Sequence, residues 1–224
     1  MEKSPAQKIS EIKATLPNGV ELVAVSKFHP AEMIQDAYEG GQRIFSESHV
    51  QELQTKHELL PADIQWHFIG HLQRNKVKYI TPYVSLIQSV DSPRLLEEIN
   101  KHALANGRRV DCLLQLHVAQ EETKFGFTPQ ECMDYLEAGA WRQMQGVRLC
   151  GMMCMASNVE DTKQIAQEFN VAYHTYEEAK TSFFSDTDSF RIRSWGMSHD
   201  YPIAIQCGSN MVRIGTAIFG PRQY

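Results

Sequence analysis

The sequence lacks several features that would assign it to a special class of protein. Its 224 residues contain no run of about 18 apolar residues, which a membrane-spanning helix needs. The first residues are polar and do not resemble a signal peptide. The five cysteines are an odd number, which does not fit a secreted disulfide framework. We therefore expect a cytoplasmic protein with reduced thiols.

A strong charge of either sign is also missing. The formal net charge is −5, and the sequence contains no long basic run. Nucleic acids and anionic membranes bind proteins through basic patches, so we expect neither as the main partner. The two short basic clusters, at 74–78 and 108–109, fit a solvated helix face and a turn.

Common nucleotide and metal motifs are absent as well. There is no Walker-type phosphate loop, and no Gly-x-Gly-x-x-Gly follows the first expected strand. His67 and His71 have the spacing of a zinc helix, but the accompanying Glu is missing and Gly70 lies where a strand gives way to a helix. Cys150 and Cys154 lie in an apolar stretch and do not have zinc-knuckle spacing. We expect no metal site.

The sequence does show a regular alternation of apolar, strand-like runs with amphipathic helical stretches. Eight alternations follow a short polar helix expected around 6–14. The expected strands are 20–26, 43–46, 64–69, 84–90, 110–118, 146–154, 190–196 and 211–214. Helical connections make the strands parallel, and eight such units in about 200 residues fit an α/β fold, a (β/α)8 TIM-type barrel with a short extra N-terminal helix. Strand counting leaves an open doubly wound sheet as the alternative.

The pattern also predicts the extent of the domain and two helix starts. No linker rich in Pro, Ser or Gly divides the chain, so residues 1–224 are expected to form a single barrel domain. Thr128 with Glu131, and Ser157 with Glu160, have capping-box spacing, in which a hydroxyl and a carboxylate each bind a backbone N–H of the first turn. These pairs predict the starts of two successive helices.

Lys27 lies at the C-terminal end of the first expected strand. The stretch 20–26 is short, apolar and rich in β-branched valine, which favours a buried strand. Ligands of α/β folds bind at this edge, where a lysine amine can form an imine with an aldehyde or ketone. Taken alone, a lysine just past a strand is more often solvated or ion-paired than reactive.

Small and polar residues follow the last two expected strands. Ser198 comes after the seventh strand, and Gly215 and Thr216 come after the eighth. In barrels, the loops at these two places often hold phosphate through backbone N–H groups and hydroxyls. We therefore expect a phosphate site formed by these three residues.

Arg213 alternates with Val212 and Ile214 along the eighth strand. If the two apolar residues pack outward against helices, Arg213 points into the barrel. A buried guanidinium needs an acceptor, either a carboxylate such as Glu47 or Asp200, or a ring nitrogen or phosphate of a ligand. The lysine on strand one, this arginine and the adjacent phosphate site together favour a cofactor.

At these residues the sequence resembles the pyridoxal phosphate homeostasis protein family (the YggS/PROSC type), whose barrel is similar to the N-terminal domain of alanine racemase. The match runs from about residue 20 to the C-terminus. It rests on the motifs AVSK at 24–27, WHFIG at 66–70 with Leu72, Gln73, Asn75 and Lys76, then Lys124 with Gly126, GMSHD at 196–200 and MVRIGTAIFG at 211–220.

The resemblance implies roles for the candidate residues. Lys27 would carry pyridoxal 5'-phosphate (PLP) as a Schiff base, and Arg213 would face its pyridine nitrogen. Ser198, Gly215 and Thr216 would hold the phosphate. No residue is assigned a catalytic role.

Two positions depart from the family pattern. Ser48 stands where the family usually has Asn, which bears on the usual Asn contact near the cofactor. Asn210 stands where the family commonly has Thr before Met-Val-Arg, and this change keeps a polar side chain.

The group at the pyridine nitrogen separates a carrier from an enzyme. An Asp or Glu keeps that nitrogen protonated and makes PLP a strong electron sink, whereas Arg213 keeps it neutral and argues against an aminotransferase. A racemase needs acid–base groups on both faces of the substrate carbon. In alanine racemase the second comes from a Tyr associated with an extra C-terminal domain and a partner subunit, whereas this sequence ends at Tyr224, directly after the barrel. We expect a protein that buffers or delivers PLP without robust turnover.

Two alternatives stay open. One is a weak PLP-dependent amino-acid racemase, and the other is a barrel enzyme acting on a sugar phosphate, with Lys27 forming an imine to the substrate. The resemblance implies PLP-dependent apoenzymes as candidate recipients of the cofactor. A monomer is expected because the sequence shows no obvious exposed apolar helix.

Overall fold

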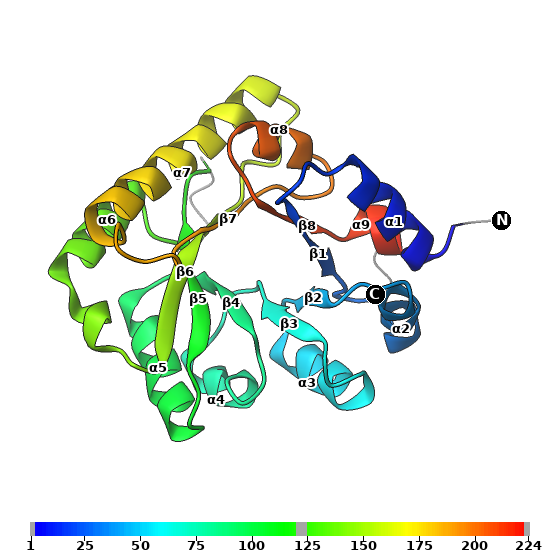
Figure 1. The fold of residues 1–224 in the computed structure, drawn as a ribbon, viewed down its shortest axis with the longest axis horizontal. Helices are drawn as coiled ribbons and strands as arrows, with labels where there is room; N and C mark the ends of the chain where they lie inside the picture. The colour runs from blue at the N-terminus through cyan, green and yellow to red at the C-terminus, as the bar shows by residue number, and fades with distance from the viewer. Residues whose placement is uncertain (1–2, 120–124, 222–224) are drawn as a thin grey trace.

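Eight parallel strands form a closed barrel, with helices around it (Figure 1). The computed structural model describes residues 3–119 and 125–221. The strands are β1 (Glu21–Val25), β2 (Ile44–Glu47), β3 (Gln65–Phe68), β4 (Leu86–Val90), β5 (Val110–Leu116), β6 (Val147–Cys154), β7 (Ile192–Ser194) and β8 (Met211–Ile214). They pair in sequence order, and β8 pairs with β1. The barrel expected from the sequence is confirmed, and the open sheet is excluded.

Helices connect the strands and cover the outside of the barrel (Figure 1). They are α1 (Pro5–Thr15), α2 (Ala31–Glu39), α3 (Val50–Leu59), α4 (Val77–Ile80), α5 (Pro93–Ala105), α6 (Pro129–Ala138), α7 (Thr162–Phe183), α8 (Tyr201–Gln206) and α9 (Thr216–Phe219), with short 3-10 helices η1 (Arg74–Lys76) and η2 (Ala140–Gln143). The extra N-terminal helix α1 packs against α2 and α9. The first and last helical elements therefore lie together beside the β1–β8 pair.

The buried side chains form two layers, because successive residues of a strand point to opposite faces. Val23 and Met211 belong to a small cluster inside the barrel. Val212 and Ile214 belong to the large cluster between strands and helices. The predicted outward packing of these two β8 residues is confirmed, and it turns Arg213 between them toward the inside of the barrel.

One of the two predicted helix starts is correct. Thr128 caps α6 with the complete capping box. The start predicted at Ser157 is wrong, because α7 begins at Thr162 and its cap is Asp161. The backbone N–H and the hydroxyl of Ser157 instead donate to the carboxylate of Glu168, over 2.6 and 2.8 Å. Ser157 therefore binds Glu168, eleven positions further along the chain, and does not cap a helix.

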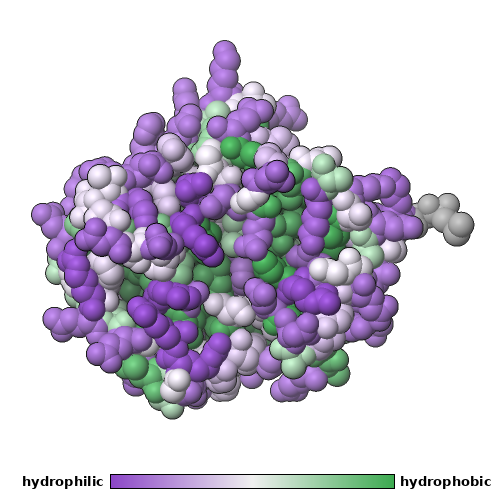
Figure 2. All heavy atoms as spheres, in the orientation of Figure 1, coloured by the Kyte–Doolittle hydropathy of each residue, from purple (hydrophilic) through white to green (hydrophobic). Residues whose placement is uncertain are grey.

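The surface is mostly polar in the view of Figure 2, where hydrophilic residues cover much of the face and hydrophobic ones show mainly toward its centre. Within the described ranges, no helix is both long and apolar enough to cross a membrane. All five cysteines are free, and four of them are buried.

Candidate functional site

A cavity of ≈ 370 Å³ opens at the C-terminal ends of the strands. Its size falls within the range of about 300–1,000 Å³ that is usual for small-molecule sites. All five residues predicted from the sequence line it: Lys27, Ser198, Arg213, Gly215 and Thr216. They come from three loops or strands far apart in the sequence, and the closure of β8 on β1 brings them together.

Lys27 reaches this cavity from a tight turn at 26–29, just after β1. The turn is closed by the His29 backbone N–H, which donates to the Ser26 carbonyl over 3.1 Å. Lys27 is half-buried and follows Val23 and Val25 on the inner face of β1. The amine is therefore presented to the cavity by a backbone segment of fixed shape.

Arg213 is almost fully buried, with 3% of its surface exposed. Its Nη1 donates to the backbone carbonyl and the hydroxyl of Ser194, over 2.6 and 2.7 Å, and its Nη2 donates to the Cys154 carbonyl over 2.8 Å. Burial lowers the pKa of Arg213 to about 10, so the guanidinium stays charged at neutral pH. The acceptors are neutral oxygens, which leaves a fixed positive charge facing the cavity.

Glu47 and Asp200, the carboxylates considered from the sequence as partners of Arg213, make no ion pair with it in the described residues. Glu47 lies on the outer side of the barrel, where it binds Lys56 at 2.7 Å. Asp200 accepts a hydrogen bond from the Met197 backbone N–H over 2.5 Å. The hydrogen bonds of Arg213 therefore go to neutral oxygens, and Asp200 acts on its guanidinium only through its charge, without a direct contact in the described residues.

A chain of hydrogen bonds runs from Arg213 across the barrel interior. The Ser194 hydroxyl donates to Gln88 Oε1 over 2.6 Å, and Gln88 Nε2 lies 3.0 Å from Nδ1 of His67. An amide N–H₂ only donates, so the His67 Nδ1 accepts and its proton lies on Nε2. Burial lowers the pKa of His67 to about 3, which keeps the ring neutral. These residues lie in the barrel interior and orient the Arg213 side chain through this chain of hydrogen bonds.

The sequence did not predict that Ser194, Gln88 and His67 form a hydrogen-bonded chain with Arg213. His67 has the spacing of a zinc ligand and lies in the family motif at 66–70, and the structure places it in the barrel interior. A sequence signal did exist for Gln88, because it lies in a strand whose other residues are Leu86, Ile87, Ser89 and Val90, whereas Ser194 follows Arg193 in the three-residue β7 and gave no such signal. Such a residue on a buried strand must find a hydrogen-bond partner, which is a sign of an interior network.

The small residues expected to hold phosphate lie next to each other. The Gly215 backbone N–H donates to the Ser198 hydroxyl over 3.3 Å. A Cβ at Gly215 would lie 3.1 Å from the carbonyl oxygen of Val25, so glycine lets β8 end close against β1. Thr216 begins α9 beside it. The hydroxyl-bearing Ser198 and Thr216 and the glycine between β8 and α9 therefore line one side of the cavity, which suits an anion.

Two histidines also line the cavity, and the sequence assigned no role to either, although His199 lies in the motif at 196–200. His29 is 4% exposed and stacks on Phe219 at 5.3 Å between ring centres. Its Nδ1 is buried and has no hydrogen-bond partner within residues 3–119 and 125–221. His199 lies on the opposite loop, after β7. A buried ring nitrogen without a partner, on a residue that lines a cavity, is a candidate to bind a ligand.

The positions that depart from the family pattern lie outside this lining. The Ser48 hydroxyl lies 3.3 Å from Nδ1 of His49. Asn210 joins β7 to β8, since it accepts from the Arg193 backbone N–H over 2.8 Å and donates to the Arg191 carbonyl over 2.9 Å. The motif residue Lys124 lies outside the described residues.

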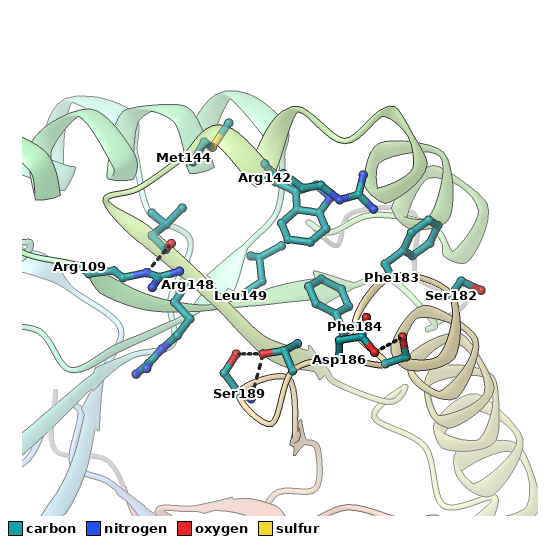
Figure 3. Close-up of a pocket in the computed structure, with 14 residues that line it drawn as sticks. Arg109, Arg142, Met144, Arg148, Leu149, Ser182, Phe183, Phe184, Asp186 and Ser189 are labelled. Carbon is teal, nitrogen blue, oxygen red and sulfur yellow. Dashed lines mark hydrogen bonds between the residues drawn. The ribbon is translucent and has the colours of Figure 1, made fainter.

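A second cavity, of ≈ 450 Å³, lies near the N-terminal ends of β5 and β6 (Figure 3). Arg109, Arg142 and Arg148 line it, and all three are exposed. Arg148 forms a two-pronged salt bridge with Asp111, with both N–O distances at 2.7 Å. Active sites of (β/α)8 barrels lie at the C-terminal end of the strands, so the larger volume does not make this the functional site. No group of three or more metal-binding side chains occurs in the described part of the chain.

Comparison with known proteins identifies the family. The alanine racemase N-terminal domain model matches residues 4–223. Over 219 residues the chain is 35% identical to a protein of Aquifex aeolicus named pyridoxal phosphate homeostasis protein, a match that covers 97% of this chain and 94% of the relative. This chain belongs to the pyridoxal phosphate homeostasis protein family. The resemblance stated from the sequence motifs is thereby confirmed.

Solved structures agree with this family. PipY of Synechococcus elongatus, solved with PLP bound, matches with a TM-score of 0.87 and 32% identity, covering 97% of this chain and 100% of that chain. An alanine racemase of Clostridium difficile matches with a TM-score of 0.76 at 14% identity, covering 99% of this chain and 57% of that chain. At that identity the likeness to the racemase shows the fold alone.

Proposed function

We propose that this chain binds PLP in the C-terminal cavity and acts in PLP homeostasis, as a carrier that buffers or delivers the cofactor without robust catalysis. The observation that carries the proposal is the convergence of an amine, a buried guanidinium and an anion site in one cavity of ≈ 370 Å³. The names of the relatives and the PLP-bound PipY structure support it.

The residues of the cavity fit the chemical groups of PLP. Lys27 offers an amine for the aldehyde, and Arg213 offers a donor for the ring nitrogen. Ser198, Gly215 and Thr216 offer hydroxyls and a backbone N–H for the phosphate. The buried Nδ1 of His29 adds one further polar atom whose partner a ligand would supply.

Attachment to Lys27 is a simple condensation. The Nζ lone pair adds to the aldehyde carbon, a C–N double bond forms, and the aldehyde oxygen leaves as water. No electrons are exchanged with an outside reagent, and added water reverses the reaction. A reversible link of this kind suits a protein that holds a cofactor and later releases it to PLP-dependent apoenzymes.

Arg213 is the reason for proposing a carrier and not an aminotransferase. A neutral ring nitrogen facing a guanidinium makes PLP a weak electron sink. The network of Ser194, Gln88 and His67 holds this donor in place. The proposal takes residues 1–224 as one PLP-binding domain that acts as a monomer in the cytoplasm, as expected from the sequence.

A weak amino-acid racemase is the second candidate, and the two histidines in the cavity favour it. His29 and His199 lie on different loops and could exchange protons with a bound substrate. A barrel enzyme that forms an imine between Lys27 and a sugar phosphate is the third. That enzyme would use the same amine and anion site without PLP.

A titration with PLP tests the proposal and separates the three candidates. The purified chain is expected to develop a yellow absorbance band with PLP, which borohydride bleaches. Incubation of the loaded protein with L-alanine or L-serine, followed by chiral analysis, is expected to give no D-isomer at an enzyme-like rate. D-isomer formed at such a rate would favour the racemase. A chain that remains colourless with PLP, but is trapped by borohydride on a sugar phosphate, would overturn both PLP candidates.

A further inference from the structure

The turn that carries Lys27 has an unusual backbone. Phe28, the next residue, has φ of 66°, and it is the only non-glycine residue with positive φ in the described ranges. This left-handed conformation is disfavoured for a bulky side chain, and at the third position of a turn glycine or asparagine is usual. Something outside the turn must therefore hold Phe28 in this shape.

Among the groups outside the turn that contact Phe28 are the ring of His49, whose centre lies 5.2 Å from that of the Phe28 ring, and Glu52 in the first turn of α3. The Phe28 backbone N–H donates to Glu52 Oε1 over 2.6 Å, which is short for such a bond. The same oxygen accepts from Lys56 Nζ at 2.7 Å, one helical turn further along α3. The side chain of Glu52 is mostly shielded from water, which strengthens both bonds.

Lys56 extends the same cluster to the other side of the turn. Its Nζ donates to the Ser26 carbonyl over 2.8 Å and to Glu47 Oε1 over 2.7 Å. Glu47 also accepts from the Ser26 hydroxyl over 2.7 Å. Both neighbours of Lys27 therefore have hydrogen-bond partners on or near α3. Ser26 binds Lys56 and Glu47, and Phe28 binds Glu52.

None of these three charged residues lines the cavity. Lys56 and Glu47 are buried between the barrel and α3, and they touch the turn from its outer side. Their hydrogen bonds act on the backbone that carries Lys27, and the charges of Lys56 and Glu52 also act over a distance on His29 in the cavity lining. Their place outside the cavity separates them from the residues that would contact PLP.

We propose that Glu52 is a positioning residue for the attachment of PLP to Lys27, because its carboxylate holds Phe28 in the left-handed conformation that aims the lysine into the cavity. This inference rests on the proposed function. It concerns the covalent step alone, since the arginine and the phosphate site belong to other loops. Loss of Glu52 is expected to lower the fraction of bound PLP that is attached, and to leave retention of PLP much less affected.

Glu52→Ala and Phe28→Gly test this in a double-mutant cycle. Glycine adopts a positive φ without steric strain, so a turn with glycine in place of Phe28 no longer needs the carboxylate. In the loaded full-length chain, Glu52→Ala is expected to lower the fraction of bound PLP trapped by borohydride on Lys27 about tenfold. In the Phe28→Gly background the same change is expected to lower it less than about threefold.

Three further variants separate positioning from a general effect on folding. Glu52→Gln keeps an oxygen that can accept from the Phe28 N–H, so it is expected to recover most of the trapped fraction. Glu58→Ala, which removes an exposed glutamate on the same helix, is the matched control and is expected to behave as wild type. If Glu52→Ala does not fold, Glu52→Asp keeps the charge beside Lys56 but shortens the reach to Phe28. It is then expected to show the same loss, and the same recovery in the Phe28→Gly background.

Equal trapped fractions in wild type and in the folded Glu52→Ala or Glu52→Asp variant would overturn the inference. So would a loss that Phe28→Gly leaves unchanged, because that result would make the role of Glu52 purely structural. If the wild-type chain itself binds no PLP, the proposed function fails instead, and this outcome is read from the wild-type titration alone.

Discussion

The two ends of the barrel both carry arginines, but in residues 3–119 and 125–221 only the C-terminal end buries one. Arg213 is 3% exposed and is held by neutral oxygens, whereas Arg109, Arg142 and Arg148 are exposed at the N-terminal end. The N-terminal cavity is the larger of the two, at ≈ 450 Å³ against ≈ 370 Å³. The burial of a charged group, and not the volume of the cavity, therefore distinguishes the C-terminal cavity as the candidate site.

The difference follows from what water does to a charge. An exposed guanidinium is hydrated and screened, so a salt bridge such as Arg148 with Asp111 contributes only about 0–1 kcal/mol to stability. A buried guanidinium costs free energy to desolvate and is kept only where hydrogen bonds offset that cost. The fold supplies these bonds to Arg213, which leaves a fixed donor with little freedom to reorient.

The largest expected effect comes from removing one arginine at each end. Arg213→Leu is expected to weaken PLP binding about 10- to 100-fold, because a hydrogen bond from a charged group contributes about 1.5–3 kcal/mol. Arg148→Leu is expected to change the affinity less than about twofold. Absorbance titration with PLP measures both.

Arg213→Lys is the control for charge. It keeps the positive charge but loses the planar fork that binds Ser194 and Cys154, so we expect it to recover only part of the affinity. Melting curves of all the variants show that folded proteins are being compared. Equal losses from Arg213→Leu and Arg148→Leu would remove the distinction between the two ends.

A smaller effect concerns the pH dependence of stability. It depends on His67, the last residue in the chain of hydrogen bonds that starts at Arg213. Burial lowers the pKa of His67 to about 3, from an ordinary value near 6.5, so the unfolded chain takes up a proton that the folded chain does not. The stability that the neutral ring contributes is complete above about pH 6.5 and is lost as the pH falls toward 3. Between pH 7 and 5.5 the loss is expected to be about 1 kcal/mol, measured by urea unfolding.

His67→Gln isolates this contribution, because its amide does not titrate. Burial raises the pKa of Glu47 to about 7, and this carboxyl affects the free energy of unfolding in the opposite direction over the same pH range. The prediction therefore concerns the difference between wild type and the variant. Parallel pH curves for the two would show that His67 is not buried as a neutral ring.

Much of the fold, and five of the residues that line the candidate cavity, could be predicted from the sequence. The alternation of strands and helices predicted the barrel, because βα units must place parallel strands side by side. Lys27, Ser198 and Thr216 were identifiable because the ends of parallel strands meet at one edge. Arg213 was identifiable because residues two apart share a face of a strand.

The residues that support the site could not be predicted in the same way. Gln88 and Ser194 meet although 106 positions separate them, and no local pattern predicts which interior side chains will touch. The same holds for Ser157, whose partner is Glu168 and not the local Glu160. The role of Glu52 depends on the backbone angle of Phe28, which sequence alone does not reveal for a bulky residue.

The most direct test of the central claim is to locate the PLP adduct. Reduction of the PLP-loaded chain with borohydride, proteolysis and mass analysis of the peptides are expected to find the added mass on the peptide containing Lys27. Lys27→Ala is expected to lose the yellow band and the adduct while remaining folded. An adduct found mainly on another lysine, or one that persists in Lys27→Ala, would contradict the assignment of the cofactor site to the C-terminal end of the barrel.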